Sequence, residues 1–89
     1  MFMEKKTNYQ ETLNSRIEFG NRVRQLRKAG GMTQDMLAEK IEISPRNLSD
    51  IENGKVNPYY STIYSIAKAF GITMSELLNL DEYDALPLF

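Results

Sequence analysis

Apolar residues recur along most of this chain at steps of three and four positions, which is the spacing of a helix with one buried face. Five such segments are present, so the pattern predicts an all-α fold, a compact domain of five helices. The first helix is expected from Ser15 to Ala29, because Gly30 and Gly31 then end the periodic run. No strand-like alternation of useful length competes with this prediction.

Polar residues and glycines mark the ends of the other helices. Thr33 and Ser44 are good N-caps for the second and third helices, and Pro45 suits a first helical position. Thr73 and Glu76 have the spacing of a capping box for the fifth helix. The expected ranges of these four helices are Gln34–Ile41, Pro45–Glu52, Tyr59–Phe70 and Met74–Leu80.

The segment from Gln34 to Glu52 is the most informative part of the chain. Its two short helices are joined by only three or four residues, too few for antiparallel packing, so they must cross steeply. Ala38 leaves room for the two axes to come close, as a helix-turn-helix requires. The outward face of the second of these helices is short or polar and could enter a DNA major groove. It consists of Pro45, Arg46, Asn47, Ser49, Asp50 and Asn53.

An ordered set of short motifs lies between about residues 17 and 80. The motifs are Phe19-Gly20, Arg22 to Arg27, Met32-Thr33-Gln34, Leu37-Ala38, Ser44-Pro45, Leu48-Ser49, Ile51 to Gly54, Pro58, Ile66-Ala67 and Phe70 to Ile72. Through them the sequence resembles the lambda-repressor-like, Xre-type (Cro/C1-type) helix-turn-helix family. The resemblance implies a transcriptional regulator, a repressor or controller, that binds a double-stranded DNA operator as a homodimer with its third helix in the major groove.

The resemblance assigns base contacts to the exposed face of the third helix. Arg46 is the main candidate, since a guanidinium can bond guanine O6 and N7 together; its alternatives are a phosphate contact or no contact. Asp50 could accept from a cytosine amino group or hold Arg46 one helical turn away. The expected base-contacting residues are Ser44, Pro45, Arg46, Asn47 and Asp50.

Phosphate contacts and one internal ion pair are also implied. Gln34 matches a family glutamine that holds a phosphate and braces the third helix, although a helix-start hydrogen bond would also explain it. Arg27 and Glu52 match a partly buried ion pair whose role is structural. The expected phosphate-contacting residues are Thr33, Gln34, Ser49, Asn53, Lys55, Tyr60 and Ser61, some of them through free backbone N–H groups.

Two positions depart from the family pattern. Glu42 stands where the turn usually has glycine, so a positive φ there would cost about 1 kcal/mol. Pro45 stands where many members present a hydrogen-bonding side chain, so DNA shape and phosphate contacts are expected to carry more of the recognition.

Composition narrows the function further. The chain has no cysteine and no histidine, and its carboxylates are scattered, so we expect no enzyme, no cofactor and no metal. It shows no signal peptide or membrane span, which predicts a cytoplasmic protein without membrane contact. Eleven basic and 12 acidic residues give a net charge of −1, with the bases early and the acids late. The basic stretch is either a binding surface or a solvated helix face.

Three regions are expected along the chain: a flexible extension over 1–14, the DNA-binding domain over 15–80, and an acidic, apolar tail over 81–89. The end of the chain is more apolar than a free acidic tail should be, so it is the expected dimer interface. An antitoxin-like or adapter protein, whose main partner is another protein bound at this tail, is the alternative function. The expected interface residues are Leu80, Tyr83, Leu86, Leu88 and Phe89.

Overall fold

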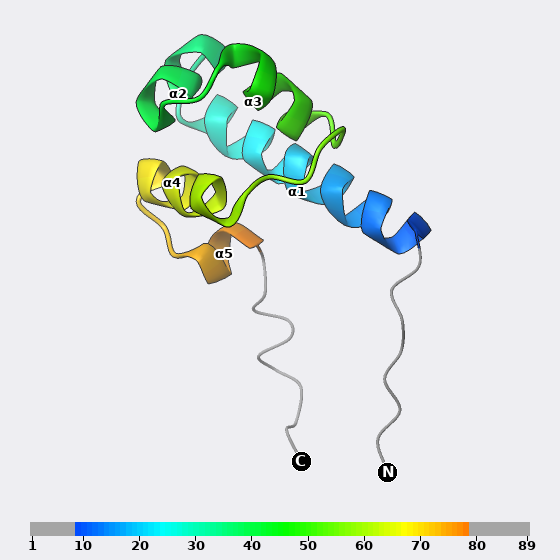
Figure 1. The fold of residues 1–89 in the computed structure, drawn as a ribbon. Helices are drawn as coiled ribbons and strands as arrows, with labels where there is room; N and C mark the ends of the chain where they lie inside the picture. The colour runs from blue at the N-terminus through cyan, green and yellow to red at the C-terminus, as the bar shows by residue number, and fades with distance from the viewer. Residues whose placement is uncertain (1–8, 79–89) are drawn as a thin grey trace, which may run out of the picture.

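The computed structural model describes residues 9–78 and confirms the all-α prediction. Five helices follow one another without a strand between residues 9 and 78. They are α1 (Tyr9–Ala29), α2 (Gln34–Ile41), α3 (Pro45–Glu52), α4 (Tyr60–Phe70) and α5 (Met74–Leu78). In Figure 1, α2 and α3 lie above the C-terminal half of the long α1, and α4 and α5 lie below α2, where α4 contacts α2 and α5 contacts α4 and α1. No helix in this part of the chain is both long and apolar enough to cross a membrane.

Helix α1 differs from the expected helix at its start. It begins at Tyr9 rather than at Ser15, and Gln10 donates a hydrogen bond to Asn14 one turn later at 3.0 Å. The added turns are mostly exposed, with Tyr9 75% accessible. Apolar periodicity cannot reveal a helical segment that buries no face, which explains the difference.

The predicted caps are confirmed. Thr33 accepts from the Met36 amide at 3.1 Å, and Ser44 accepts from the Asn47 amide at 3.0 Å, ahead of Pro45. Thr73 and Glu76 form the expected reciprocal capping box at the start of α5. These local bonds satisfy amides that a helix N-terminus leaves unpaired, so they fix where each helix begins.

One core joins all five helices. Ala38 in α2 is 1% exposed, and α2 packs against α3, in agreement with a small buried residue in the first helix of this pair. The turn between them is closed by Glu42 in the left-handed region, at φ 62° and ψ 43°, as expected for a position that usually holds glycine. The buried apolar residues are Val23, Leu37, Ala38, Ile41, Leu48, Ile51, Ile66, Ala67 and Leu77.

Candidate nucleic-acid interface

The N-terminal half of α3 presents the residues expected to read DNA bases. Ser44, Pro45, Arg46 and Asn47 are exposed, and the Arg46 side chain is 88% accessible. Asp50 lies one turn from Arg46, with its Oδ2 3.7 Å from Arg46 Nε. This exposed pair is worth little to stability.

The opposite side of α3 is anchored to α1 by a buried ion pair. Arg27 Nε donates to Glu52 Oε2 at 2.7 Å, and Arg27 Nη2 donates to Oε1 at 3.1 Å. A third bond, from Arg27 Nη1 to the Met32 carbonyl oxygen at 2.8 Å, ties the pair to the loop before α2. Glu52 is 1% exposed and Arg27 is 7% exposed, so the expected pair is present and is almost completely buried.

Gln34 adds a contact from α2 to the same Glu52 carboxylate. Its Nε2 donates to Glu52 Oε1 at 3.0 Å, so one carboxylate receives hydrogen bonds from both α1 and α2. This is the bracing role expected for Gln34. A phosphate contact by the same residue stays a prediction, as does one by Thr33, which is exposed beside it.

The surroundings of Glu52 keep it ionised. Burial alone would raise its pKa, but hydrogen bonds from Arg27 and Gln34 and the positive charges of Arg27 and Arg24 outweigh burial. The pKa of Glu52 is therefore lowered from its ordinary value of 4.5. The C-terminal end of α3 thus holds a buried negative charge, and both oxygens of its carboxylate accept hydrogen bonds.

Sequence reasoning did not single out Arg24, which joins this cluster from α1. Its Nη2 donates to Asn53 Oδ1 at 2.8 Å, its Nη1 donates to Asn21 Oδ1 at 3.3 Å, and its Nε lies 3.5 Å from Glu52 Oε1. Asn53 in turn donates from Nδ2 to Ser49 Oγ at 3.3 Å. The helical spacing of Arg24 and Arg27, three residues apart, was the one signal that they face the same helix.

The start of α4 lies beside the exposed face of α3. Asn47 and Tyr59 both line a hollow of about 260 Å³ between α3 and the loop that precedes α4. Tyr59 is the N-cap residue of α4, and no side chain within residues 9–78 caps this N-terminus. Tyr60 is 72% exposed, and Ser61 is exposed beside it. The first amides of α4 are thus available to an anionic group that approaches α3.

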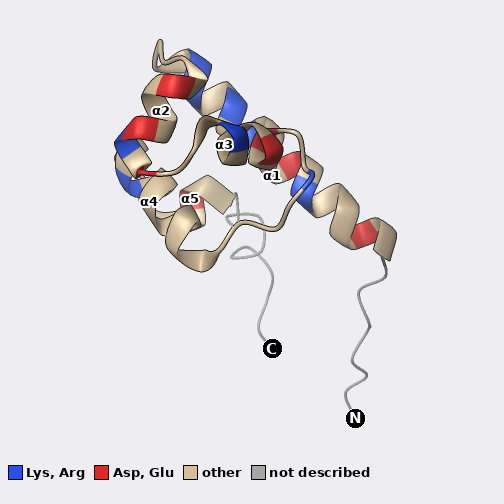
Figure 2. Cartoon of the chain, turned by 45° about the horizontal axis from the view of Figure 1, so that its top comes forward, with Lys and Arg blue, Asp and Glu red and all other residues tan. Residues whose placement is uncertain are grey.

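The three arginines in the basic stretch of α1 form hydrogen bonds to residues of other helices. Besides Arg24 and Arg27, Arg22 donates from Nη2 to the Glu76 carbonyl oxygen at 3.0 Å, which ties α1 to α5. Figure 2 shows basic and acidic residues on α1, α2 and α3 alike. The three arginines between Asn21 and Gly30 therefore hold helices together, which was expected for Arg27 through its pair with Glu52 but not for Arg22 or Arg24.

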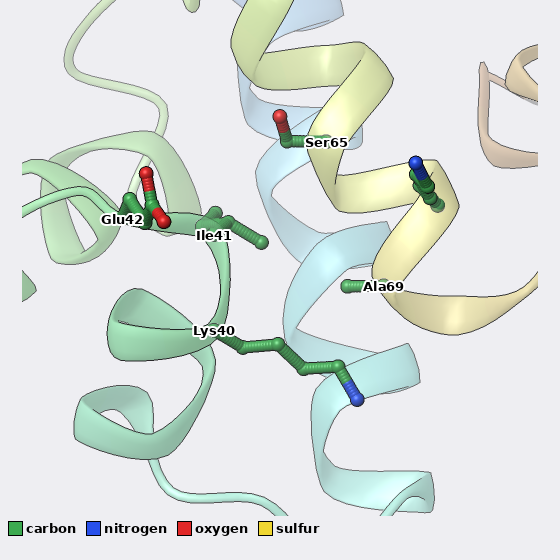
Figure 3. Close-up of a pocket in the computed structure, with 6 residues that line it drawn as sticks. Lys40, Ile41, Glu42, Ser65 and Ala69 are labelled. Atoms are coloured by element: carbon green, nitrogen blue, oxygen red, sulfur yellow. The ribbon is translucent and has the colours of Figure 1, made fainter.

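A larger cavity opens on another part of the molecule, between α2 and α4. It has a volume of about 460 Å³, and Lys40 reaches along it toward α4 (Figure 3). None of the expected DNA-contacting residues lines it. The lining residues are Lys40, Ile41, Glu42, Ser65, Lys68 and Ala69. The expected dimer residues, from Leu80 to Phe89, lie outside the described residues.

Comparison with known proteins gives consistent matches. A family model described as a helix-turn-helix domain matches residues 20–82. The immunity repressor protein of Bacillus phage phi105 is 41% identical over 60 residues, covering 67% of this chain and 42% of the repressor. Control protein C.BamHI of Bacillus amyloliquefaciens is 38% identical over 69 residues, covering 76% of this chain and 85% of the control protein.

A solved structure also matches this chain. The restriction-modification controller protein C.AhdI from Aeromonas hydrophila has a TM-score of 0.70 and 31% identity, covering 72% of this chain and 97% of that one. Several relatives are longer, and the chain spans less than half of their length. With the family model, the relatives and the fold in agreement, the chain belongs to the helix-turn-helix domain family, in its lambda-repressor-like, Xre-type branch.

Proposed function

We propose that this protein is a sequence-specific, double-stranded DNA-binding transcriptional regulator, a repressor or controller rather than an enzyme, acting in the cytoplasm. In this proposal α3 enters the major groove and Arg46 reads a guanine. The loop after α3 and the first amides of α4 hold the flanking phosphates. The names of two relatives, a repressor and a control protein, support a regulatory role.

The observation that carries the proposal is the two-sided nature of α3. One side is fixed to α1 and α2 by a buried carboxylate with three hydrogen bonds from Arg27 and Gln34. The other side leaves Arg46 88% accessible. Direct readout of base edges requires a rigid helix with exposed polar side chains, because a helix that is already ordered loses little conformational entropy on binding.

Selection from a random duplex pool, followed by fluorescence anisotropy over a salt series, tests the proposal. We expect one palindromic sequence to be preferred, with affinity that falls as salt rises. Arg46→Ala should lose most of that preference, about 1 to 3 kcal/mol for a bidentate base contact. Lys68→Gln is the matched control, since Lys68 lines the α2–α4 cavity and should not affect preference. A folded protein that binds no duplex at low salt would refute the proposal.

Homodimerisation forms part of the same proposal. One α3 contacts only a few base pairs, so selective binding calls for two copies on two half-sites about one helical turn apart. The apolar residues from Leu80 to Phe89 remain the proposed interface. Sedimentation of the full chain should show a dimer, and the double variant Leu86→Asp/Leu88→Asp should shift it toward monomer. A wild-type monomer bound singly to its duplex would contradict this part.

A protein partner at the tail is the second candidate. The sequence feature favouring it is the combination of Asp81, Glu82 and Asp84 with apolar residues in a chain of net charge −1. Such a segment suits a basic, partly apolar surface. Copurification from the native host with the wild-type chain, compared with a chain whose three acids are changed to Asn or Gln, separates this role from homodimerisation.

A further inference from the structure

The contacts among Arg24, Asn53 and Ser49 have a defined direction. Arg24 Nη2 donates to Asn53 Oδ1 at 2.8 Å, so the oxygen of the Asn53 amide faces the guanidinium. The reversed amide would set an NH₂ group against another donor. Asn53 Nδ2 therefore faces Ser49 Oγ, to which it donates at 3.3 Å. One arginine on α1 thus sets the orientation of two polar side chains on the C-terminal half of α3.

The direction of these bonds decides what Ser49 can do. Its oxygen accepts from Asn53, so its hydroxyl hydrogen is left for another acceptor, and no described residue is seen to accept it. Asn53 is exposed and retains a second amide hydrogen. Both residues thus retain a hydrogen to donate, Asn53 at an exposed position and Ser49 at a half-buried one, and the Asn53 oxygen is already bonded to Arg24. Such a surface fits an anionic oxygen.

We propose that Arg24 is a positioning residue for DNA binding, which sets Asn53 and Ser49 as hydrogen-bond donors to one backbone phosphate. The inference rests on the proposed DNA-binding function and adds to it a residue outside the expected interface. We assign Arg24 this indirect role because each of its three nitrogens lies within 3.5 Å of an oxygen of Asn21, Glu52 or Asn53, which holds its side chain against α3. Its position is fixed by the same Glu52 carboxylate that anchors α3.

A double-mutant cycle on the selected duplex tests this inference. Ser49→Ala should weaken binding about tenfold, the loss of roughly one well-made hydrogen bond to a charged group, and Arg24→Gln, which also misplaces Asn53, should weaken it at least as much. The double variant should bind no more weakly than Arg24→Gln alone, because Arg24 acts through Ser49 and Asn53. Losses that multiply to about a hundredfold would overturn the inference, since Arg24 would then act independently of Ser49.

The salt dependence separates positioning from direct contact with phosphate. Arg24→Gln should keep the wild-type slope of log K against log salt, whereas Lys55→Gln, an expected phosphate contact, should reduce that slope by about one. A reduced slope in Arg24→Gln would make Arg24 itself a phosphate ligand and overturn the inference. Arg24→Lys, which keeps a donor for Asn53, should bind within about threefold of wild type.

A measurement without DNA shows whether Arg24→Gln changes the surroundings of Asn53 in a protein that is still folded. The side-chain amide signals of Asn53 in a ¹H–¹⁵N spectrum should shift in Arg24→Gln and stay near their wild-type positions in Arg24→Lys. Unchanged Asn53 signals in Arg24→Gln, in a spectrum that is otherwise that of a folded protein, would overturn the inference whatever the variant's affinity for DNA. Failure of the wild-type protein to bind any duplex would instead remove the proposed function, and this inference with it.

Discussion

Gly20 in α1 lies directly against the backbone of Glu52 in α3. A Cβ atom at Gly20 would stand 2.5 Å from the Glu52 carbonyl oxygen and closer still to that of Ile51. Real Cβ atoms do not approach backbone oxygens so closely. The absence of a side chain at this position is therefore what lets Arg27, about two turns further along α1, reach the Glu52 carboxylate at 2.7 Å.

Gly20→Ala should destabilise the fold by about 2 kcal/mol or more. Alanine favours a helix over glycine by about 1 kcal/mol, but separating α1 from α3 costs more than that gain. Gly30→Ala is a matched control, because the nearest atoms to a Cβ there are 3.5 Å away. Urea unfolding followed by circular dichroism measures both. Equal stabilities of the two variants would show that α1 and α3 can move apart without cost.

Glu52→Gln should destabilise the protein by about 3 kcal/mol or more, because it leaves the buried Arg27 guanidinium without its charge partner. Asp50→Asn removes the carboxylate of the exposed pair with Arg46 and should cost less than about 1 kcal/mol. The same unfolding assay at pH 7 compares them. If both variants unfolded at similar urea concentrations, the buried Glu52 pair would contribute no more to stability than the exposed Asp50 pair.

The lowered pKa of Glu52 gives stability a dependence on acid. The unfolded state binds this proton near pH 4.5, and the folded state binds it only at lower pH. The contribution of Glu52 is therefore complete above about pH 5 and is lost as pH falls through the lower, folded-state pKa. Melting temperatures between pH 7 and pH 3 should fall more steeply for wild type than for Glu52→Gln. Parallel curves would contradict the assigned ionisation of Glu52.

Glu42 carries backbone strain that can be released. It is the one non-glycine with positive φ among the described residues, at 62°. Glu42→Gly should therefore stabilise the protein by up to about 1 kcal/mol, reduced somewhat by the greater freedom of glycine in the unfolded chain. Glu39→Gly, an exposed position inside α2, should instead destabilise by about 1 kcal/mol. Melting temperatures should rise for Glu42→Gly and fall for Glu39→Gly. A lower melting temperature in Glu42→Gly would show that the backbone at residue 42 is not strained.

Local chemistry explains why much of the fold could be predicted from the sequence. Thr33, Ser44 and Thr73 cap helices through bonds that span only three residues, so the sequence alone reveals them. The ion pair of Arg27 with Glu52 spans 25 positions, and it was expected only through the family resemblance. Contacts of this kind depend on how helices pack, which periodicity does not specify.

The contacts of Arg24 could not be predicted from the sequence at all. Its contact with Asn53 spans 29 positions and exists because Gly20 lets α1 approach the end of α3. From the sequence, Arg24 was one member of a basic stretch, and Asn53 was a candidate phosphate contact. Nothing in the spacing of either residue indicated that the two would meet, so the candidate site was missing the residue that orients part of it.

Gln34 offers the sharpest test of the brace between α2 and α3. Gln34→Glu changes one NH₂ group into an oxygen, at the point where Nε2 now donates to Glu52 Oε1 at 3.0 Å. Two carboxylates would then face each other beside the core, so we expect a loss of about 2 kcal/mol at pH 7 that shrinks near pH 5, as one of them takes up a proton. Gln25→Glu, the same change at an exposed position of α1, should cost less than about 0.5 kcal/mol.

Urea unfolding at the two pH values measures both Gln34→Glu and Gln25→Glu. The pH dependence matters as much as the size of the loss, because a simple packing defect at Gln34 would destabilise equally at pH 7 and pH 5. Recovery near pH 5 in Gln34→Glu alone would place the repulsion between residues 34 and 52. A Gln34→Glu protein as stable as the Gln25→Glu control would mean that Gln34 does not hold Glu52 in solution, and the Glu52 carboxylate would then be held from α1 alone.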